Sequence, residues 1–174
     1  MANTYTLIAS NTLSSSAASV TFSSIPATYT DLVLRLSVRS STSATNAVMQ
    51  MLLNNDSDPT GYYSRTELRG DGAAAASSRD SNDNKMQFRF SDASNATSNT
   101  FSNIEIYIPS YLASQNKPLS GINAMETNAT TAYLTAQAGL WRKTNAIDRI
   151  DLSWVDTNNF VSGSSFFLYG IKNS

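Results

Sequence analysis

The sequence contains no cysteine and no histidine, and charged residues make up only 14% of it. Soluble domains typically carry about 25% charged residues. Without cysteine there can be no disulfide, and without either residue the common nucleophile–base pairs and zinc sites are unavailable. The formal net charge is −1, so no strongly basic surface for nucleic acid or anionic lipid can form. We therefore expect no nucleic-acid partner and no metal or cofactor of these common kinds.

Long apolar runs are also missing. No stretch approaches the roughly 20 apolar residues of a membrane-spanning helix. The first 20 residues have neither the basic start nor the long apolar centre of a signal peptide. We expect a protein that is made in the cytoplasm, does not enter a membrane, and leaves the cell by lysis or assembly.

What the sequence does contain is an alternation of polar loops and short strand patterns. In residues 31–39, Leu32, Leu34 and Leu36 fall on one side of a strand, while Arg35 and Ser37 fall on the other. Successive side chains of a strand point to opposite faces, so this pattern buries one face and exposes the other. Loops rich in Ser, Thr, Asn and Ala separate such stretches throughout the chain. The pattern is typical of an all-β, antiparallel, two-sheet sandwich.

The 174 residues match the size of one domain, and no change in composition marks a linker. We predict a single β-sandwich domain over residues 1–174 with about ten short strands. Residues 1–9 form either an extended N-terminal arm or an edge strand. The alanine-rich segment at residues 73–84 could be helical, but its flanking glycines and its Ser, Asp and Asn residues favour an exposed loop.

One segment resembles a calcium-binding loop. Asp56, Asp58 and Thr60 alternate, Gly61 follows, and Glu67 stands where a bidentate carboxylate would complete the site. Pro59 stiffens this segment, and the flanking patterns are those of strands, whereas the calcium motif requires helices. We favour a turn that connects two strands, with a weak candidate Ca²⁺ loop as the alternative.

Several aromatic side chains are candidates for an interaction surface. Along residues 132–141, the alanines and leucines alternate with Tyr133 and Trp141, so Trp141 is expected on the face opposite to the apolar one, next to the cation Arg142. A large flat ring beside a cation is typical of protein–protein hot spots and of sugar-binding sites. The alternative is that both faces of the sheet are covered and these rings belong to the core. The predicted interaction surface comprises Tyr5, Tyr62, Tyr63, Tyr107, Trp141 and Arg142.

Catalysis has few candidate residues. The three glutamates, Glu67, Glu105 and Glu126, lie in separate segments, and no spacing indicates the carboxylate pair of a glycosidase. There is no glycine-rich phosphate-binding loop, because Gly70-Asp71-Gly72 is too short and does not begin a helix. We predict that the protein is not an enzyme and that it needs no cofactor.

Three further stretches resemble a known family when taken together. They are residues 22–29 leading into Leu32-Val33-Leu34-Arg35, then Ala138-Gly139-Leu140-Trp141-Arg142, and finally residues 164–171. Their order and spacing resemble a family of short β-sandwich structural proteins of tailed bacteriophages. The turn at residues 54–61 and the following Leu68-Arg69-Gly70 are also similar to a loop of that family.

This resemblance implies a jelly-roll-like virion component, most simply a capsid decoration (cement) protein that bridges major capsid proteins and stabilises the head. The implied partners are the major capsid protein and copies of the chain itself, as a homotrimer exposed on the particle surface. A tail, baseplate or head-fibre component that binds a receptor is the first alternative, and a carbohydrate-binding module is the second.

Overall fold

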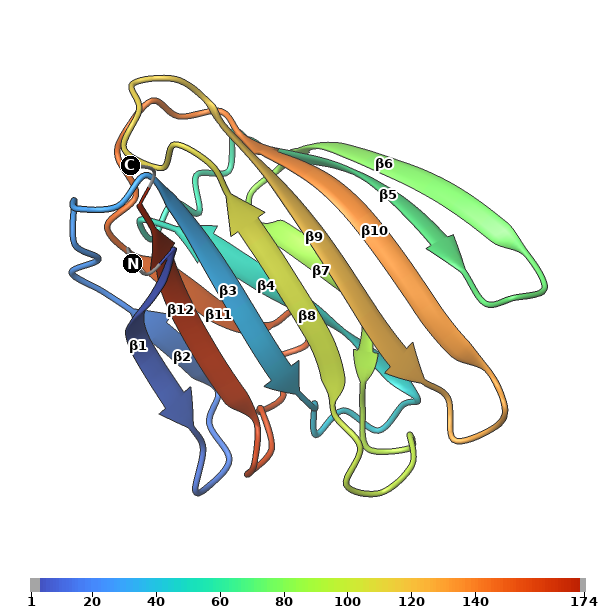
Figure 1. The fold of residues 1–174 in the computed structure, drawn as a ribbon. Helices are drawn as coiled ribbons and strands as arrows, with labels where there is room; N and C mark the ends of the chain where they lie inside the picture. Colours follow the sequence, from blue (N-terminus) through green and yellow to red (C-terminus); the bar gives the residue numbers. More distant parts are fainter. Residues whose placement is uncertain (1–3, 173–174) are drawn as a thin grey trace.

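The computed structural model describes residues 4–172, and Figure 1 shows them as two stacked layers of strands. No residue in this range is helical. The structure contains twelve strands: β1 (Tyr5–Thr12), β2 (Ser19–Phe22), β3 (Asp31–Val38), β4 (Asn46–Leu53), β5 (Tyr63–Gly70), β6 (Ala75–Asp83), β7 (Met86–Asp92), β8 (Ser102–Ile108), β9 (Lys117–Glu126), β10 (Ala132–Trp141), β11 (Ile150–Trp154) and β12 (Ser165–Ile171).

The strands form two antiparallel sheets of unequal width. The larger sheet has eight strands in the order β1-β12-β3-β8-β9-β10-β5-β6, and the smaller has four in the order β2-β11-β4-β7. Side chains from the facing sides of the two sheets fill one hydrophobic core. The predicted all-β, antiparallel, two-sheet sandwich in a single domain is confirmed, with twelve strands where the sequence indicated about ten.

Strand β3 shows how the sequence pattern produces this core. Leu32, Leu34 and Leu36 point inward and are almost completely buried. Arg35 lies on the outer face and is exposed. Trp154 of β11, Phe160 and Phe166 of β12 pack in a row between the two sheets, with ring centroids 4.8 Å and 5.0 Å apart. Such aromatic contacts add about 0.5–1.5 kcal/mol per pair to the effect of burial.

The expectation for residues 73–84 is wrong, for both the loop and the helix. Most of this segment is β6, which pairs with β5 from Gly70↔Ala75 to Tyr63↔Asp83. A tight turn precedes it, in which Asp71 Oδ1 accepts hydrogen bonds from the amides of Ala73 and Ala74. As the edge strand of the larger sheet, β6 leaves most of its side chains exposed, so its sequence lacks the apolar alternation that identifies a strand.

At the opposite edge, β1 pairs with β12 through Tyr5↔Ile171 to Thr12↔Ser165. Residues 5–9 therefore belong to an edge strand, which was one of the two predicted forms of the N-terminal segment. Residues 1–3 of that predicted segment lie outside the described residues.

The difference in sheet width determines which faces are covered. Strand β7 is the outermost strand of the smaller sheet and contacts β8, β9, β10 and β5 of the larger one. The β5–β6 hairpin, on the right of Figure 1, extends past β7. One end of the larger sheet is thus only partly covered on its inner face.

Candidate functional site

The outer face of the larger sheet carries an exposed apolar area over β5, β10 and β9. Leu68 pairs with Ala136, which pairs with Ile122, so the three side chains lie in one row across the strands. Leu68, Ile122 and Leu134 are 62%, 49% and 53% exposed. We define the outer patch as these exposed side chains: Leu68, Ile122, Leu134, Ala136 and Ala138.

The outer patch is hollowed at its centre. A shallow depression of about 350 Å³ lies over it, bordered by Leu68 on one side and Tyr107 on the other. Its floor is low because the side chains between them, Ser120, Ala136 and Ala138, are small. An exposed apolar surface with a concave centre is a typical docking surface for another protein.

Charge is scarce around this surface. On β3 and β8, Arg35 Nε and Glu105 Oε2 lie 2.9 Å apart, with side-chain exposures of 57% and 44%. These two opposite charges pair with each other, so they leave no net field over the outer patch. Docking on this surface would therefore depend on apolar contact and shape.

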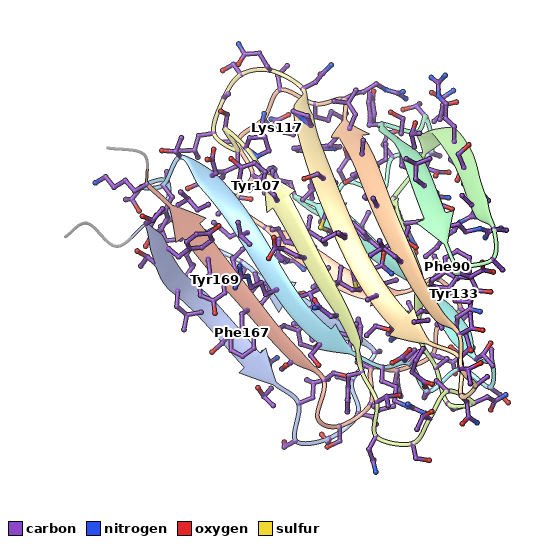
Figure 2. All side chains as sticks on the ribbon, turned by 45° about the vertical axis from the view of Figure 1, so that its right-hand side comes forward. Phe90, Tyr107, Lys117, Tyr133, Phe167 and Tyr169 are labelled. Atoms are coloured by element: carbon purple, nitrogen blue, oxygen red, sulfur yellow. The ribbon has the colours of Figure 1, made fainter. Side chains whose placement is uncertain are left out.

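A second group of side chains occupies the same face over β1 and β12. Tyr5 meets Tyr169 edge to face with ring centroids 6.3 Å apart, and Phe167 stacks on Tyr169 at 6.4 Å. Figure 2 shows Tyr107, Phe167 and Tyr169 on this side of the molecule. The Tyr107 hydroxyl donates to Asp31 Oδ2 at 2.8 Å, and this hydrogen bond raises the pKa of Tyr107. Two predicted surface residues, Tyr5 and Tyr107, therefore share one face.

Tyr63 and Trp141 do not belong to any exposed surface. Each is 1% exposed, and their rings stack with centroids 6.4 Å apart. Trp141 Nε1 donates to Asp56 Oδ2 at 2.7 Å, and the Tyr63 hydroxyl accepts from the amide of Leu53 at 2.9 Å. Burial raises the pKa of Tyr63. The alternative interpretation, that these rings are core, is the one the structure supports.

The prediction that Trp141 is exposed was wrong because it assigned the faces of β10 the wrong way round. The alternation of apolar and polar residues along this strand was predicted correctly. Thr135, Gln137 and Trp141 point inward and are buried, whereas the apolar Leu134 and Ala136 point outward. The polar side of this strand faces the core, so a rule that buries the apolar side assigns every residue to the wrong face.

The two remaining predicted surface residues lie at a turn beside β5. Lys143 Nζ sits 3.4 Å above the centroid of the Tyr62 ring. Arg142 donates to the backbone oxygen of Gly61 and, at 2.7 Å, to Asn82 Oδ1. The six predicted residues thus form no single surface: two lie on the outer face, two are core, and two tie a turn together.

The candidate calcium residues are engaged in other contacts. Asp58 Oδ1 accepts from the amide and the hydroxyl of Thr60, which lowers the pKa of Asp58. Asp56 accepts from Trp141, and Glu67 is bound in a separate cluster described next. Within residues 4–172, no group of three or more acidic, histidine or cysteine side chains could hold a metal ion.

A buried charge cluster lies on the inner face of the β5–β6 hairpin. Arg65 Nη1 lies 2.5 Å from Glu67 Oε2, Arg65 also binds Asp80 on β6, and Ser78 Oγ donates to Glu67 Oε1 at 2.8 Å. Arg65 and Glu67 are 3% and 2% exposed. Arg89 approaches the same two carboxylates at 3.9 Å and 3.6 Å. Sequence reasoning missed this cluster because it treated the β6 residues as a loop.

A bulge in β7 aims two side chains at this hairpin. Ala47 pairs with Ser91 but Met49 pairs with Phe88, so Arg89 and Phe90 together face a single residue of β4. Phe90 has φ 64°, a left-handed conformation that is an outlier for a bulky residue and costs on the order of 1–3 kcal/mol. The bulge places the Phe90 ring against Tyr133 of β10, with centroids 5.2 Å apart.

The three glutamates are all engaged in contacts within the chain. Glu67 is buried with both oxygens bonded, Glu105 is paired with Arg35, and Glu126 accepts from Thr97, Thr100 and the amide of Asn128.

Over residues 4–172, no helix is long and apolar enough to span a membrane. No protein-family model matches this chain, and no curated protein matches it either.

Proposed function

We propose that this protein is a structural component of a tailed-bacteriophage particle, most simply a capsid decoration (cement) protein whose outer patch docks on the major capsid protein. The observation that carries the proposal is the outer patch itself. Three large apolar side chains stand about half exposed on a face whose one central ion pair is internally neutralised. The resemblance of the sequence to virion proteins supplies the class of partner.

The mechanism is burial of surface at junctions between capsid subunits. Covering the exposed half of Leu68, Ile122 or Leu134 contributes roughly 1 kcal/mol each. A stable interface buries about 800 Å² per partner, so the aromatic side chains over β1 and β12 would have to take part as well. Many such contacts around a shell add up and oppose the outward pressure of the packaged DNA without any chemical step.

The first experiment measures binding to capsids that lack this protein. The purified chain is added to such particles, and the bound fraction is read by sedimentation. Ile122→Glu and Leu134→Glu should each weaken binding about ten-fold or more, because an unpaired charge would be buried at the interface. Val155→Glu is the matched control, since Val155 is 47% exposed and follows β11 of the smaller sheet. Equal effects of all three substitutions would contradict the proposal.

Copy number separates the head from the tail. A decoration protein is present in many copies, in fixed proportion to the major capsid protein, whereas a tail, baseplate or receptor-binding component is present in a few. Quantitative mass spectrometry of purified particles measures this ratio. Particles without the protein should also lose DNA at lower temperature if it cements the head.

The proposal includes self-association as a homotrimer. Light scattering of the purified chain at micromolar concentration tests this part directly. A monomeric protein that binds capsids normally would contradict the proposed trimer but would agree with the proposed docking role.

A further inference from the structure

A small cavity lies at the open end of the sandwich, away from the outer patch. Its volume is about 160 Å³, and its lining includes Arg69, Asp71, Phe90 and Tyr133, together with small residues of the β5–β6 turn. Figure 2 shows Phe90 and Tyr133 together beside the hairpin. At about 30 Å³ per water molecule, the cavity has room for about five waters, or for one small ring.

Arg69 is the principal charged group of the cavity. Its guanidinium lies 4.9 Å from the centroid of the Phe90 ring, and Phe90 in turn stacks on Tyr133 with an interplanar angle of 14°. The neighbouring inner-face arginines, Arg65 and Arg89, are both within ion-pair distance of carboxylates. In the part of the chain that the structure describes, no carboxylate lies within ion-pair distance of Arg69. The Arg69 guanidinium is thus held in position by stacking on an aromatic ring, and its N–H groups can donate hydrogen bonds to an anion.

A hydrogen-bond acceptor, Asp71, lines the same cavity two residues after Arg69. Asp71 Oδ1 accepts hydrogen bonds from the amides of Ala74 and Ala73 at 2.8 Å and 2.9 Å, and these bonds lower the pKa of Asp71. The carboxylate is therefore fixed in orientation and ionised at neutral pH. Its second oxygen can accept a hydrogen bond from a hydroxyl group, and its charge disfavours a ligand with two negative charges.

An unpaired polar group adjoins Arg69. Thr135 pairs with Arg69 across β10 and β5, so the two side chains share the inner face. Thr135 is 1% exposed, and its hydroxyl has no hydrogen-bond partner. Burying an unpaired hydroxyl is unfavourable, and such groups are uncommon in folded proteins. The unpaired Thr135 hydroxyl and the left-handed backbone of Phe90 both lower the stability of the fold near Arg69. Such costs often cluster at functional sites.

We propose that this cavity binds an acidic sugar, namely a hexuronic acid residue of a glycan. The guanidinium of Arg69 pairs with the sugar carboxylate through two parallel hydrogen bonds. Asp71 accepts from a ring hydroxyl, and the Phe90–Tyr133 stack forms an apolar wall for the ring. This binding is separate from docking through the outer patch and does not depend on the proposed virion function.

The experiment is a titration of the isotope-labelled full chain, followed by nuclear magnetic resonance. Galacturonate and glucuronate should shift the backbone signals of Asp71 and Ala74 and the side-chain signal of Arg69 with millimolar affinity. Galactose and glucose should bind about ten- to hundred-fold more weakly, because they lack the carboxylate that pairs with the guanidinium. Equal binding of neutral and acidic sugars, or no shift at these residues, would overturn the proposal.

Inorganic phosphate and acetate distinguish sugar binding from anion binding. Phosphate should bind more weakly than galacturonate because of the charge on Asp71, and acetate should bind more weakly because it has no ring hydroxyl. If either matches galacturonate, the cavity is a general anion site and the sugar assignment is wrong.

Single substitutions test whether galacturonate binds in this cavity. Arg69→Gln should reduce galacturonate affinity about ten-fold or more, and Arg79→Gln should leave it unchanged. Arg79 is the matched control because it is an exposed arginine on β6 that does not line the cavity. Tyr133→Leu removes the aromatic ring that forms part of the apolar wall and gives a second test if Arg69→Gln does not fold; it should weaken binding a few-fold. Loss of affinity in Arg79→Gln comparable with that in Arg69→Gln would contradict the assignment.

Discussion

The two ends of the eight-stranded sheet bury opposite kinds of side chain. At the end formed by β12, β3 and β8, the inner face consists of leucine, isoleucine and phenylalanine, and the smaller sheet covers it. At the end formed by β10 and β5, Tyr63 and Trp141 still join the core, but the rest of the inner face carries Thr135, Gln137, Arg65 and Glu67, while Leu68 and Leu134 point outward. Apolar and polar side chains alternate along the strands at both ends. At the first end the leucines face the core, whereas at the second end they face outward.

This difference follows from the width of the smaller sheet. Its outermost strand, β7, contacts β9, β10 and β5, but the β5–β6 hairpin extends past it. Arg65 and Glu67 are buried, whereas the Asp80 and Arg89 side chains are 38% and 36% exposed, so the polar cluster reaches from the core to solvent at this end. The apolar side chains of these strands lie on the outer face instead. The open end of the sandwich is thus held together by polar contacts on its inner face and leaves Leu68 and Leu134 exposed on its outer face.

The largest expected effect concerns the buried charges. Arg65→Ala should lower the free energy of unfolding by about 3–5 kcal/mol, because Glu67 would remain buried without its closest cation. Arg79→Ala on the adjacent strand should change it by less than about 0.5 kcal/mol, since Arg79 is exposed. Urea denaturation of both variants measures the difference. Similar values for the two would mean that the polar cluster does not stabilise the open end.

A stabilising substitution is expected at the same end. Thr135→Val keeps the shape of the side chain and removes a buried hydroxyl that has no partner. The unfolding free energy should rise by about 1 kcal/mol, because the desolvation cost of that hydroxyl disappears. Thermal denaturation checks this, and a lower melting temperature would indicate that the hydroxyl makes a favourable contact, for instance with a bound water.

The pH dependence of stability should differ between the native chain and Asp83→Asn. Burial raises the pKa of Asp83, with a further contribution from the charge of Asp80, and Asp83 Oδ2 has no hydrogen-bond partner. A raised pKa means that the folded state binds the proton more tightly than the unfolded state, so the stability from this group is present at low pH. It is lost as the pH rises through the raised pKa.

Asp83→Asn should therefore be the more stable protein at pH 7, and its advantage should shrink as the pH falls through the raised pKa of Asp83 and be gone below the ordinary aspartate pKa of 3.8. Denaturation curves measured between pH 3 and pH 7 test the sign. An advantage that grows toward acid would show that Asp83 is stabilised in its charged form.

The sequence predicted a strand where one face of that strand packs against the core. It did not predict a strand where both faces are largely exposed. For β3, the leucine alternation predicted both the strand and its buried face. For β6, an edge strand with small polar side chains, there was no alternation to detect. For β10, the alternation predicted the strand, but the covered face depends on how far β7 reaches, and that is a property of the assembled sheets.

The candidate site was predictable to a smaller extent for the same reason. Tyr107 was assigned to a surface because it alternates with the isoleucines of its strand, and Tyr5 because it lies in the N-terminal arm or edge strand; both lie on the outer face. Trp141 was assigned to a surface because Leu134 and Ala136 were assumed to be core. The cation–aromatic contact of Arg69 depends on a bulge in β7 that brings distant residues together, and no local pattern signals it.

The smallest effect is expected for the ion pair on the outer face at the well-covered end. Arg35 and Glu105 face each other across β3 and β8, as Arg65 and Asp80 do across β5 and β6, but the first pair is about half exposed. A double-mutant cycle with Arg35→Ala and Glu105→Ala should give a coupling energy of about 0.2–1 kcal/mol, reduced further by salt. A coupling as large as that of the buried cluster would mean that burial by the second sheet is not what separates the two ends. Weak coupling would leave Arg35 and Glu105 free to exchange partners when another molecule covers this face.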